Sequence, residues 1–372
     1  MSSENCCVSW DFLSDFITDA FECAGVPRED AVICTDVLLE ADRRGIVSHG
    51  VNRFKPIYLD RIKDGIQNPV TNFEIIRETP TTAVIDGHDG MGQVIGYRAT
   101  KLGIEKAKKY GMSTIAVRKS CHYGIAGYYV SMATEAGLIG ITGTNARPAI
   151  APAQGSEAMM GTNPLTFGLP TDEPFPFLLD CATSIVQRAT IEAYARRGEP
   201  TPPGTVIASD GSEMTDSAEI LKALLEGRAA LCPIGSSNGN HSSAYKGYGY
   251  ATVVEILSAA LQQGSYMKML SGIGPNGEKV PHHLGHFFIF IDPEAFMGLD
   301  AFKKTAGDIL RALRSSRLAP GFDRIYTAGE KEYLSWQRQK DTGLVIDDRS
   351  IQRELMEVRD NFGLTKYRFP FE

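Results

Sequence analysis

The sequence has few cysteines, no excess of positive charge and no long apolar run. Its seven cysteines in 372 residues form no CxxC pair and are too sparse for a disulfide scaffold, so we expect free thiols in a reducing compartment. The longest apolar stretch, residues 286–291, is far shorter than the about 20 residues of a membrane helix. The acidic amino-terminal segment lacks the basic start of a signal peptide. We therefore expect a cytoplasmic protein that binds no membrane.

The charge balance also excludes a class of partner. Lys and Arg number 38 against 45 Asp and Glu, a net charge of −7. Such a chain has no surplus of cations to neutralise phosphates, so we expect no nucleic-acid partner. The hydrophobic fraction of 43% and the charged fraction of 22% are typical of a globular protein. The length predicts about two domains.

The pattern of apolar residues predicts helices first and an α/β arrangement afterwards. Three helices are expected over residues 8–23, 28–44 and from Gly50 to residue 63, followed by strands at 73–78 and 82–86. Irregular backbone is expected at 145–176, 198–216 and 235–249, which are rich in Pro and Gly. The remaining expected elements are helices at 96–110, 125–137, 185–197, 250–262 and 301–317, strands at 113–117, 139–144, 177–181 and 287–291, and a helical tail from 347.

The first candidate site lies at the start of the third helix. Ser48, His49 and Gly50 precede it, and Arg53 follows His49 by four residues, a spacing that places both side chains on one helix face. An imidazole can pass a proton at neutral pH, and a guanidinium can hold a carboxylate by two hydrogen bonds. The pair suits a 2-oxo or 2-hydroxy acid. The alternative is a solvated helix start with a surface histidine, because this spacing is common by chance.

Other polar motifs lie at turns. Residues 120–124 join a strand to a helix, where backbone N–H groups can hold an anion. Asp180 ends a buried strand, the position at which open α/β sheets bind ligands. Thr162 and Asn163 offer hydrogen bonds to a small polar ligand, and Lys246 lies in a glycine-rich stretch from which it can reach a phosphate. Ordinary capped turns remain the alternative for these motifs, except that for Lys246 the alternative is a flexible loop tip with an exposed lysine.

One glycine motif is similar to a dinucleotide-binding turn. Gly90, Gly92 and Gly96 follow a predicted strand and precede a helix, with one residue too many before the third glycine. The next strand ends in Arg118 and Lys119, where a base would suit NADP. Glycine is also needed wherever a turn requires positive φ, so the motif alone does not establish a nucleotide site.

The three clustered histidines, His282, His283 and His286, have partial metal-ligand spacing. His282 and His286 are four residues apart, as in a helical metal pair. Pro281 precedes them and a predicted strand follows, so no helix is expected there and no metal site is favoured. A metal-dependent hydrolase that uses these histidines is kept as an alternative function.

The order of the polar motifs along the chain resembles that of the type-2 malate/L-lactate dehydrogenase family, from about residue 10 to residue 350. The motifs that carry this resemblance are Ser48-His49-Gly50 with Arg53, Ser120-x-His122-Tyr123-Gly124, Gly161-Thr162-Asn163-Pro164, Leu179-Asp180-x-Ala182-Thr183-Ser184, Lys246-Gly247-Tyr248-Gly249, Gly285-His286-Phe287-Phe288 and Gly329-Glu330. Each motif is weak by itself, and their joint order is specific.

The resemblance implies an α/β protein with the family's own, non-Rossmann cofactor fold. A mixed-sheet NAD(P)-binding domain is expected over residues 86–299, and a helical dimerisation and substrate domain over 1–85 with 300–372. The glycines at 90–96 are then structural rather than phosphate-binding. The resemblance also implies a homodimer.

The implied activity is hydride transfer between NAD(P) and a small 2-hydroxy or 2-oxo acid, with malate or lactate favoured. In the resemblance, His49 is the catalytic proton donor and acceptor, and Ser48 positions it. Arg53 matches the carboxylate clamp, and Thr162 matches a substrate contact. The resemblance places His122 at the junction of nicotinamide and substrate, with the catalytic acid–base role as its alternative.

The cofactor implied is NAD, contacted by His122, Gly124, Asp180, Cys181, Ala182, Lys246, Gly329 and Glu330. NADP is the alternative, because Arg147 stands where Ser or an acid is usual and could hold a 2′-phosphate. Ala189 and Thr190 replace the usual Gly and charged residue after the Ala182 motif. Because of this departure, the second alternative function is that of a catalytically silent relative, which binds the cofactor without turnover.

Overall fold

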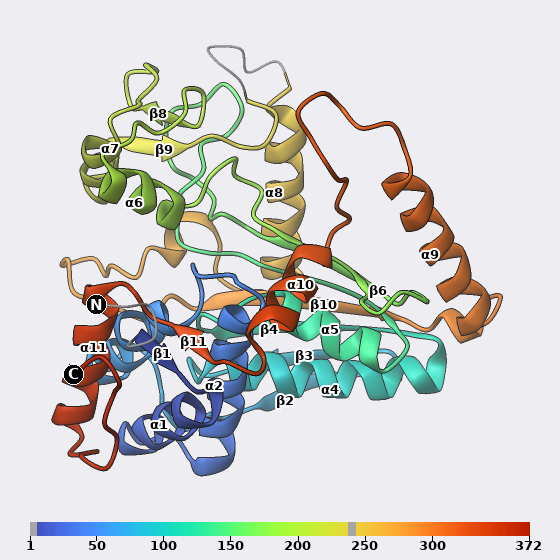
Figure 1. Cartoon of the computed structure of the whole chain (residues 1–372), viewed down its shortest axis with the longest axis horizontal. Coiled ribbons are helices and arrows are strands. Elements are labelled where there is room, and N and C mark those ends of the chain that lie inside the picture. Colours follow the sequence, from blue (N-terminus) through green and yellow to red (C-terminus); the bar gives the residue numbers. More distant parts are fainter. Residues whose placement is uncertain (1–5, 237–242) are drawn as a thin grey trace.

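A mixed sheet of seven strands forms the centre of the computed structural model, which describes residues 6–236 and 243–372 (Figure 1). Only β3 and β4 run parallel, and every other pair of neighbouring strands in this sheet is antiparallel. In spatial order the strands are β2 (Glu74–Glu78), β3 (Thr82–Asp86), β4 (Met112–Ser120), β10 (Leu284–Ile291), β5 (Ile139–Thr144), β6 (Leu165–Leu169) and β7 (Phe177–Cys181).

Helices cover both faces of this sheet (Figure 1). Phe288 and Phe290 of β10 point into a core beneath α4 (Gly92–Tyr110) and α5 (Gly127–Glu135). Gly285 of the same strand lies against the backbone of α8 (Tyr245–Ala259) on the other face. The expected α/β layering is therefore confirmed, with a mixed sheet.

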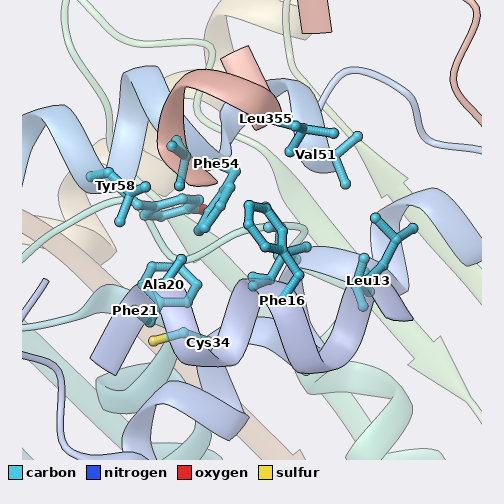
Figure 2. Close-up of a cluster of buried hydrophobic side chains, with 14 of the residues drawn as sticks. Leu13, Phe16, Ala20, Phe21, Cys34, Val51, Phe54, Tyr58 and Leu355 are labelled. Carbon is cyan, nitrogen blue, oxygen red and sulfur yellow. The ribbon is translucent and has the colours of Figure 1, made fainter. Parts of the chain in front are cut away.

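The two chain ends share a second core, shown in Figure 2. Phe16 of α1 (Trp10–Cys23) and Phe54 pack in it with Leu355 of α11 (Arg349–Asn361), and α2 (Arg28–Arg43) completes it. A two-stranded ribbon of β1 (Cys7–Val8) and β11 (Leu344–Val345) joins the ends directly. The expected division into domains at residues 85 and 300 stays a prediction.

The segment after Gly50 is wound unevenly, where the sequence predicts one helix. It has a 3₁₀ turn (Val51–Arg53), a π-helical stretch (Phe54–Leu59) and one α-turn, α3 (Asp60–Lys63). Pro56 lies inside it and has no N–H to donate, which explains the loss of regular α-helical bonding. This uneven segment carries Arg53 and Tyr58 to the site described below.

The loops expected from Pro and Gly content contain further elements. β6 lies within the 145–176 segment, and α8 begins at Tyr245 instead of residue 250. A small outer layer has its own core; its elements are α6 (Arg188–Arg197), β8 (Val206–Ala208), α7 (Ser217–Leu225) and β9 (Ala229–Leu231). Residues 237–242 of the predicted 235–249 loop lie outside the described residues.

Helices α9 (Leu299–Arg314) and α10 (Glu330–Gln339) complete the C-terminal part (Figure 1). Among the residues described, no helix combines the length and apolar character that a membrane crossing requires.

Candidate functional site

Two histidines that lie 73 positions apart in the sequence face each other in the structure. The rings of His49 and His122 are 5.5 Å apart between centroids and nearly parallel, at 21°. His49 precedes the 3₁₀ turn, and His122 follows β4. The two motifs that the sequence singled out are therefore brought together.

His49 is held by its neighbours in a neutral state. Its Nδ1 lies 2.8 Å from the Ser48 hydroxyl oxygen. Nε of Arg53 donates to the Ser48 carbonyl oxygen at 2.7 Å, which leaves the other guanidinium nitrogens available. Burial, and then the Arg53 charge, lower the pKa of His49 to about 4. At neutral pH the imidazole is uncharged and can accept a proton.

The loop that carries His49 is fixed by a residue that the sequence analysis missed. Asp42 of α2 accepts the Val51 N–H at 2.8 Å. Gly50 lies so close that a Cβ there would overlap the Asp42 carboxylate, which explains why glycine is needed. Burial raises the pKa of Asp42 to about 7. The sequence offers one signal for this contact: Asp42 interrupts the apolar pattern of its helix, and the Ser48-His49-Gly50 motif ends eight residues later.

His122 is fixed on one side of its ring. Its Nδ1 lies 2.8 Å from the Tyr58 hydroxyl and accepts the Gly124 N–H at 3.2 Å. Because a backbone N–H can only donate, Nδ1 is the acceptor and the ring proton lies on Nε2. Burial, and then the proximity of His49 and the nearby arginines, keep the pKa of His122 well below its usual value. The ring is a fixed hydrogen-bond donor.

Gly92 explains the glycine motif before α4. A Cβ at this position would overlap the backbone carbonyls of Cys121 and His122. The start of α4 therefore packs directly under the His122 turn, and glycine is required for that approach. Arg118, at the end of β4, is paired with Asp86 at 2.9 Å. The motif positions His122, in agreement with its structural interpretation.

A large cavity of about 570 Å³ opens beside His49. Its lining includes the turn before α5, and the residues that line it are Gly45, Ile46, Val47, Ser48, His49, Asn52, Gly124, Ile125, Ala126, Thr162, Pro164, Leu178, Asp180, Ala182, Gln187, Ala189, Thr190, Glu192, Ala193, Arg196 and Glu332. The volume lies within the range of ligand and cofactor pockets. Oδ1 of Asn52 is buried and has no hydrogen-bond partner among the described residues, so it can accept one from a bound group.

Asp180 and Thr162 lie in the wall of this large cavity. The Asp180 carboxylate accepts the Gly127 N–H at 2.7 Å and the Thr166 hydroxyl at 2.9 Å, so it fixes the start of α5. The carbonyl of Thr162 accepts the Thr183 N–H at 2.9 Å. Asn163, with a φ of 35°, donates to buried Glu255 at 2.7 Å. These bonds fix the turn that presents Thr162.

A second cavity of about 310 Å³, the arginine cavity, adjoins the first. It is lined by His49, Arg53, Ile57, Arg61, His122, Ala146, Arg147, Ala149, Thr162, Gln187, Arg188, Ala189, Leu231, His282 and Leu284. His49, Thr162, Gln187 and Ala189 line both cavities. Four arginines converge here, and the sequence analysis identified only Arg53 as a clamp. Arg53, Ile57 and Arg61 follow one another at intervals of four residues, a spacing that places side chains on one helix face. This spacing is the sequence signal that could have identified Arg61.

Four of the expected cofactor contacts lie outside both of these cavities. Cys181 is half-buried on β7, and Lys246 is exposed on the first turn of α8. Gly329 lines a neighbouring cavity that shares Leu178 and Glu332 with the large one. Glu330 is buried and paired with Arg324. Their cofactor roles stay predictions.

The three clustered histidines point to separate partners. His282 Nδ1 donates to the Leu270 carbonyl at 3.0 Å, and His283 Nδ1 lies 2.7 Å from Asp89. His286 is buried between Ser120 and Thr144, at 2.8 and 2.7 Å. Within residues 6–236 and 243–372, no group of three His, Cys, Asp or Glu side chains is placed to hold a metal ion. The hydrolase alternative finds no support in this geometry.

The chain is similar to known dehydrogenases over nearly its whole length. Its sequence is 41% identical over 354 residues to malate dehydrogenase of Pyrococcus horikoshii, covering 95% of both chains. It is 38% identical over 350 residues to L-sulfolactate dehydrogenase of Methanocaldococcus jannaschii, covering 94% of this chain and 95% of the relative. The crystal structure of malate dehydrogenase from Entamoeba histolytica matches with a TM-score of 0.91 at 41% identity, covering 96% of this chain and 98% of that one.

The match to the family model itself extends over residues 8–354, which include every residue of both cavities. The paired histidines, the arginine beside them and the adjoining cavities thus lie in a chain that belongs to the malate/L-lactate dehydrogenase family of oxidoreductases.

Proposed function

We propose that the protein transfers a hydride between NAD(P) and a small 2-hydroxy or 2-oxo acid, with malate or lactate as the favoured substrates. The observation that carries this proposal is that His49 lines both cavities, one suited to a cofactor and the other rich in arginine. A proton-transfer group at that boundary can reach the hydroxyl of a substrate held beside the nicotinamide.

The large cavity is the proposed cofactor site. Its volume and the unpartnered Asn52 oxygen support a dinucleotide with a polar carboxamide. A sheet in which only β3 and β4 are parallel supports a cofactor fold other than the Rossmann type. NAD is proposed over NADP, because Arg147 lines the arginine cavity and is not among the residues of the large one.

A bound nicotinamide supplies or accepts the hydride. Neutral His49 takes the hydroxyl proton of the 2-hydroxy acid during oxidation and returns it during reduction. Arg53 binds the carboxylate through the guanidinium nitrogens that are not bonded to Ser48. Thr162, in the wall between the cavities, donates a hydrogen bond to the substrate.

His122 is proposed to act as a donor to substrate oxygen rather than as the base. Its Nδ1 is occupied by Gly124 and Tyr58, so the neutral ring offers Nε2–H and has no free lone pair. Protonation at Nδ1 would direct a ring N–H against the Gly124 N–H. This asymmetry supports His49 as the acid–base residue of the pair.

A homodimer in the cytoplasm is the proposed state of the protein. Apolar side chains exposed on α9, such as Ile309 and Leu313, support a partner on that helix. The seven free cysteines support a reducing compartment. Sedimentation of the purified protein at micromolar concentration checks the dimer.

The test of this function is a panel of 2-oxo acids with NADH and NADPH, followed at the absorbance of the reduced nicotinamide. We expect oxidation of NADH with oxaloacetate or pyruvate. Tight nicotinamide binding without turnover of any acid would instead favour the catalytically silent relative, which the Ala189 and Thr190 departures leave open.

A further inference from the structure

The arginine cavity holds more positive charge than a single carboxylate needs. Beside Arg53, three other arginines reach it from separate segments: Arg61 from α3, Arg147 from the loop after β5 and Arg188 from the first turn of α6. Arg53 lies in the 3₁₀ turn (Val51–Arg53) and Arg61 in α3 (Asp60–Lys63), so the two guanidinium groups reach the cavity from different elements of the segment after Gly50.

These charges are poorly neutralised within the protein. Arg188 pairs with Glu192 at 2.9 Å. Arg61 and Arg147 form no ion pair with any carboxylate of the described residues, although both line the cavity. Desolvation, and then the charge of Arg188, lower the pKa of Arg147, and burial lowers that of Arg61. Like charges that converge without counter-ions favour the binding of an anion.

His282, which also lines this cavity, does not supply another cation. Burial, and then the charge of Arg61, lower the pKa of His282 to about 4. Its Nδ1 is bonded to the Leu270 carbonyl. At neutral pH His282 is uncharged, and Arg188 is paired with Glu192, so the second positive centre consists of Arg61 and Arg147.

We propose that Arg61 and Arg147 form a second anion subsite, which selects 2-oxo and 2-hydroxy acids with another anionic group at the far end of a short carbon chain. This inference rests on the proposed function, in which Arg53 holds the first carboxylate. The second group is a carboxylate or a sulfonate, because both present several oxygens to planar guanidinium donors. A monoanionic acid such as pyruvate leaves the subsite empty and binds more weakly.

The experiment compares oxaloacetate, sulfopyruvate and pyruvate as substrates with NADH, in the wild type and in Arg147→Gln and Arg61→Gln. In the wild type we expect a KM for at least one dianion that is about tenfold or more below that for pyruvate. Each substitution should raise the KM of that dianion about tenfold and leave the KM of pyruvate within about twofold. The better of the two dianions identifies carboxylate or sulfonate as the second group.

Two controls keep the result interpretable. Lys222→Gln removes one exposed charge of α7 outside the cavity and should leave all three KM values unchanged. Arg147→Lys keeps the charge and should retain part of the dianion preference, and the NADH dissociation constant reports whether each variant is folded.

The outcomes separate this inference from the proposed function. Reduction of pyruvate with a KM equal to that of both dianions in the wild type would overturn the second subsite and leave the dehydrogenase proposal intact. Equal losses for pyruvate and dianions in both variants would also overturn it. Failure of the wild type to reduce any of the three acids would contradict the proposed function, and this inference with it.

Discussion

The Tyr58 hydroxyl lies 2.8 Å from Nδ1 of His122, across 64 residues of sequence. Tyr58 is otherwise part of the apolar core formed by the two chain ends (Figure 2). One side chain thus links the packing of the N-terminal helices to the orientation of a site histidine.

Tyr58→Phe should weaken this orientation without creating a cavity. The Gly124 N–H still bonds Nδ1, so the tautomer is retained but held less firmly. Loss of one buried hydrogen bond, about 1 kcal/mol, predicts a fall in kcat of roughly five- to tenfold. Steady-state kinetics, with thermal unfolding as a control, check this. An unchanged kcat would show that the Tyr58 contact is only structural.

Arg53→Lys should raise the KM of the 2-oxo acid by about tenfold or more, because an ammonium cannot bind a carboxylate with two parallel hydrogen bonds. The Nε bond to the Ser48 carbonyl is also lost. The NADH dissociation constant serves as the control and should stay within about twofold. A KM equal to that of the wild type would contradict the clamp.

Asp42→Asn should change how stability depends on pH. The pKa of Asp42 is about 7 in the folded protein and near 3.8 in the unfolded chain, so the folded state binds this proton more tightly. The resulting contribution to stability is complete below about pH 4 and is lost as pH rises from 4 through 7. Asn keeps an oxygen for the Val51 N–H and does not titrate. The variant should gain stability relative to the wild type between pH 4 and 7, by about 1.4 kcal/mol per unit of pKa difference. Parallel curves of Tm against pH would contradict this.

The pH profile of 2-hydroxy acid oxidation should report the low pKa of His49. Because His49 is neutral above about pH 4, kcat/KM should keep its value as pH falls through 6.5, where an unperturbed histidine would become protonated. Repeating the profile in Asp42→Asn removes the other group that titrates next to this loop. An acidic limb near 6.5 in both proteins would mean that His49 is not the base, or that its burial is lost in solution.

The local sequence predicts that Ser48, His49 and Arg53 lie together, because they are close neighbours in one motif, and the structure shows them in contact. It also gave β3 and β5 their observed bounds, since short β-branched runs between turn residues predict strands well. The resemblance predicts a structural role for the glycines at 90–96, and the close approach of Gly92 to the His122 backbone gives the physical reason.

Contacts between distant segments could not be predicted in the same way. Tyr58 fits the apolar face of its helix, and nothing in that pattern shows that its hydroxyl reaches His122. β6 was missed because its five residues are stabilised by pairing with β5 and β7 rather than by their own pattern. Arg147 and Arg188 join Arg61 only through the fold, so the sequence does not show that these charges share one cavity.

The most direct test of the account is the rate of hydride transfer in a single turnover of His49→Ala with NADH and oxaloacetate. We expect a fall of about 10²- to 10⁴-fold, with the NADH dissociation constant nearly unchanged and partial recovery on addition of free imidazole. His88→Asn, at a half-buried histidine outside both cavities, should transfer at the wild-type rate. Transfer in His49→Ala within a few-fold of the wild type, with NADH bound normally, would contradict the role of His49.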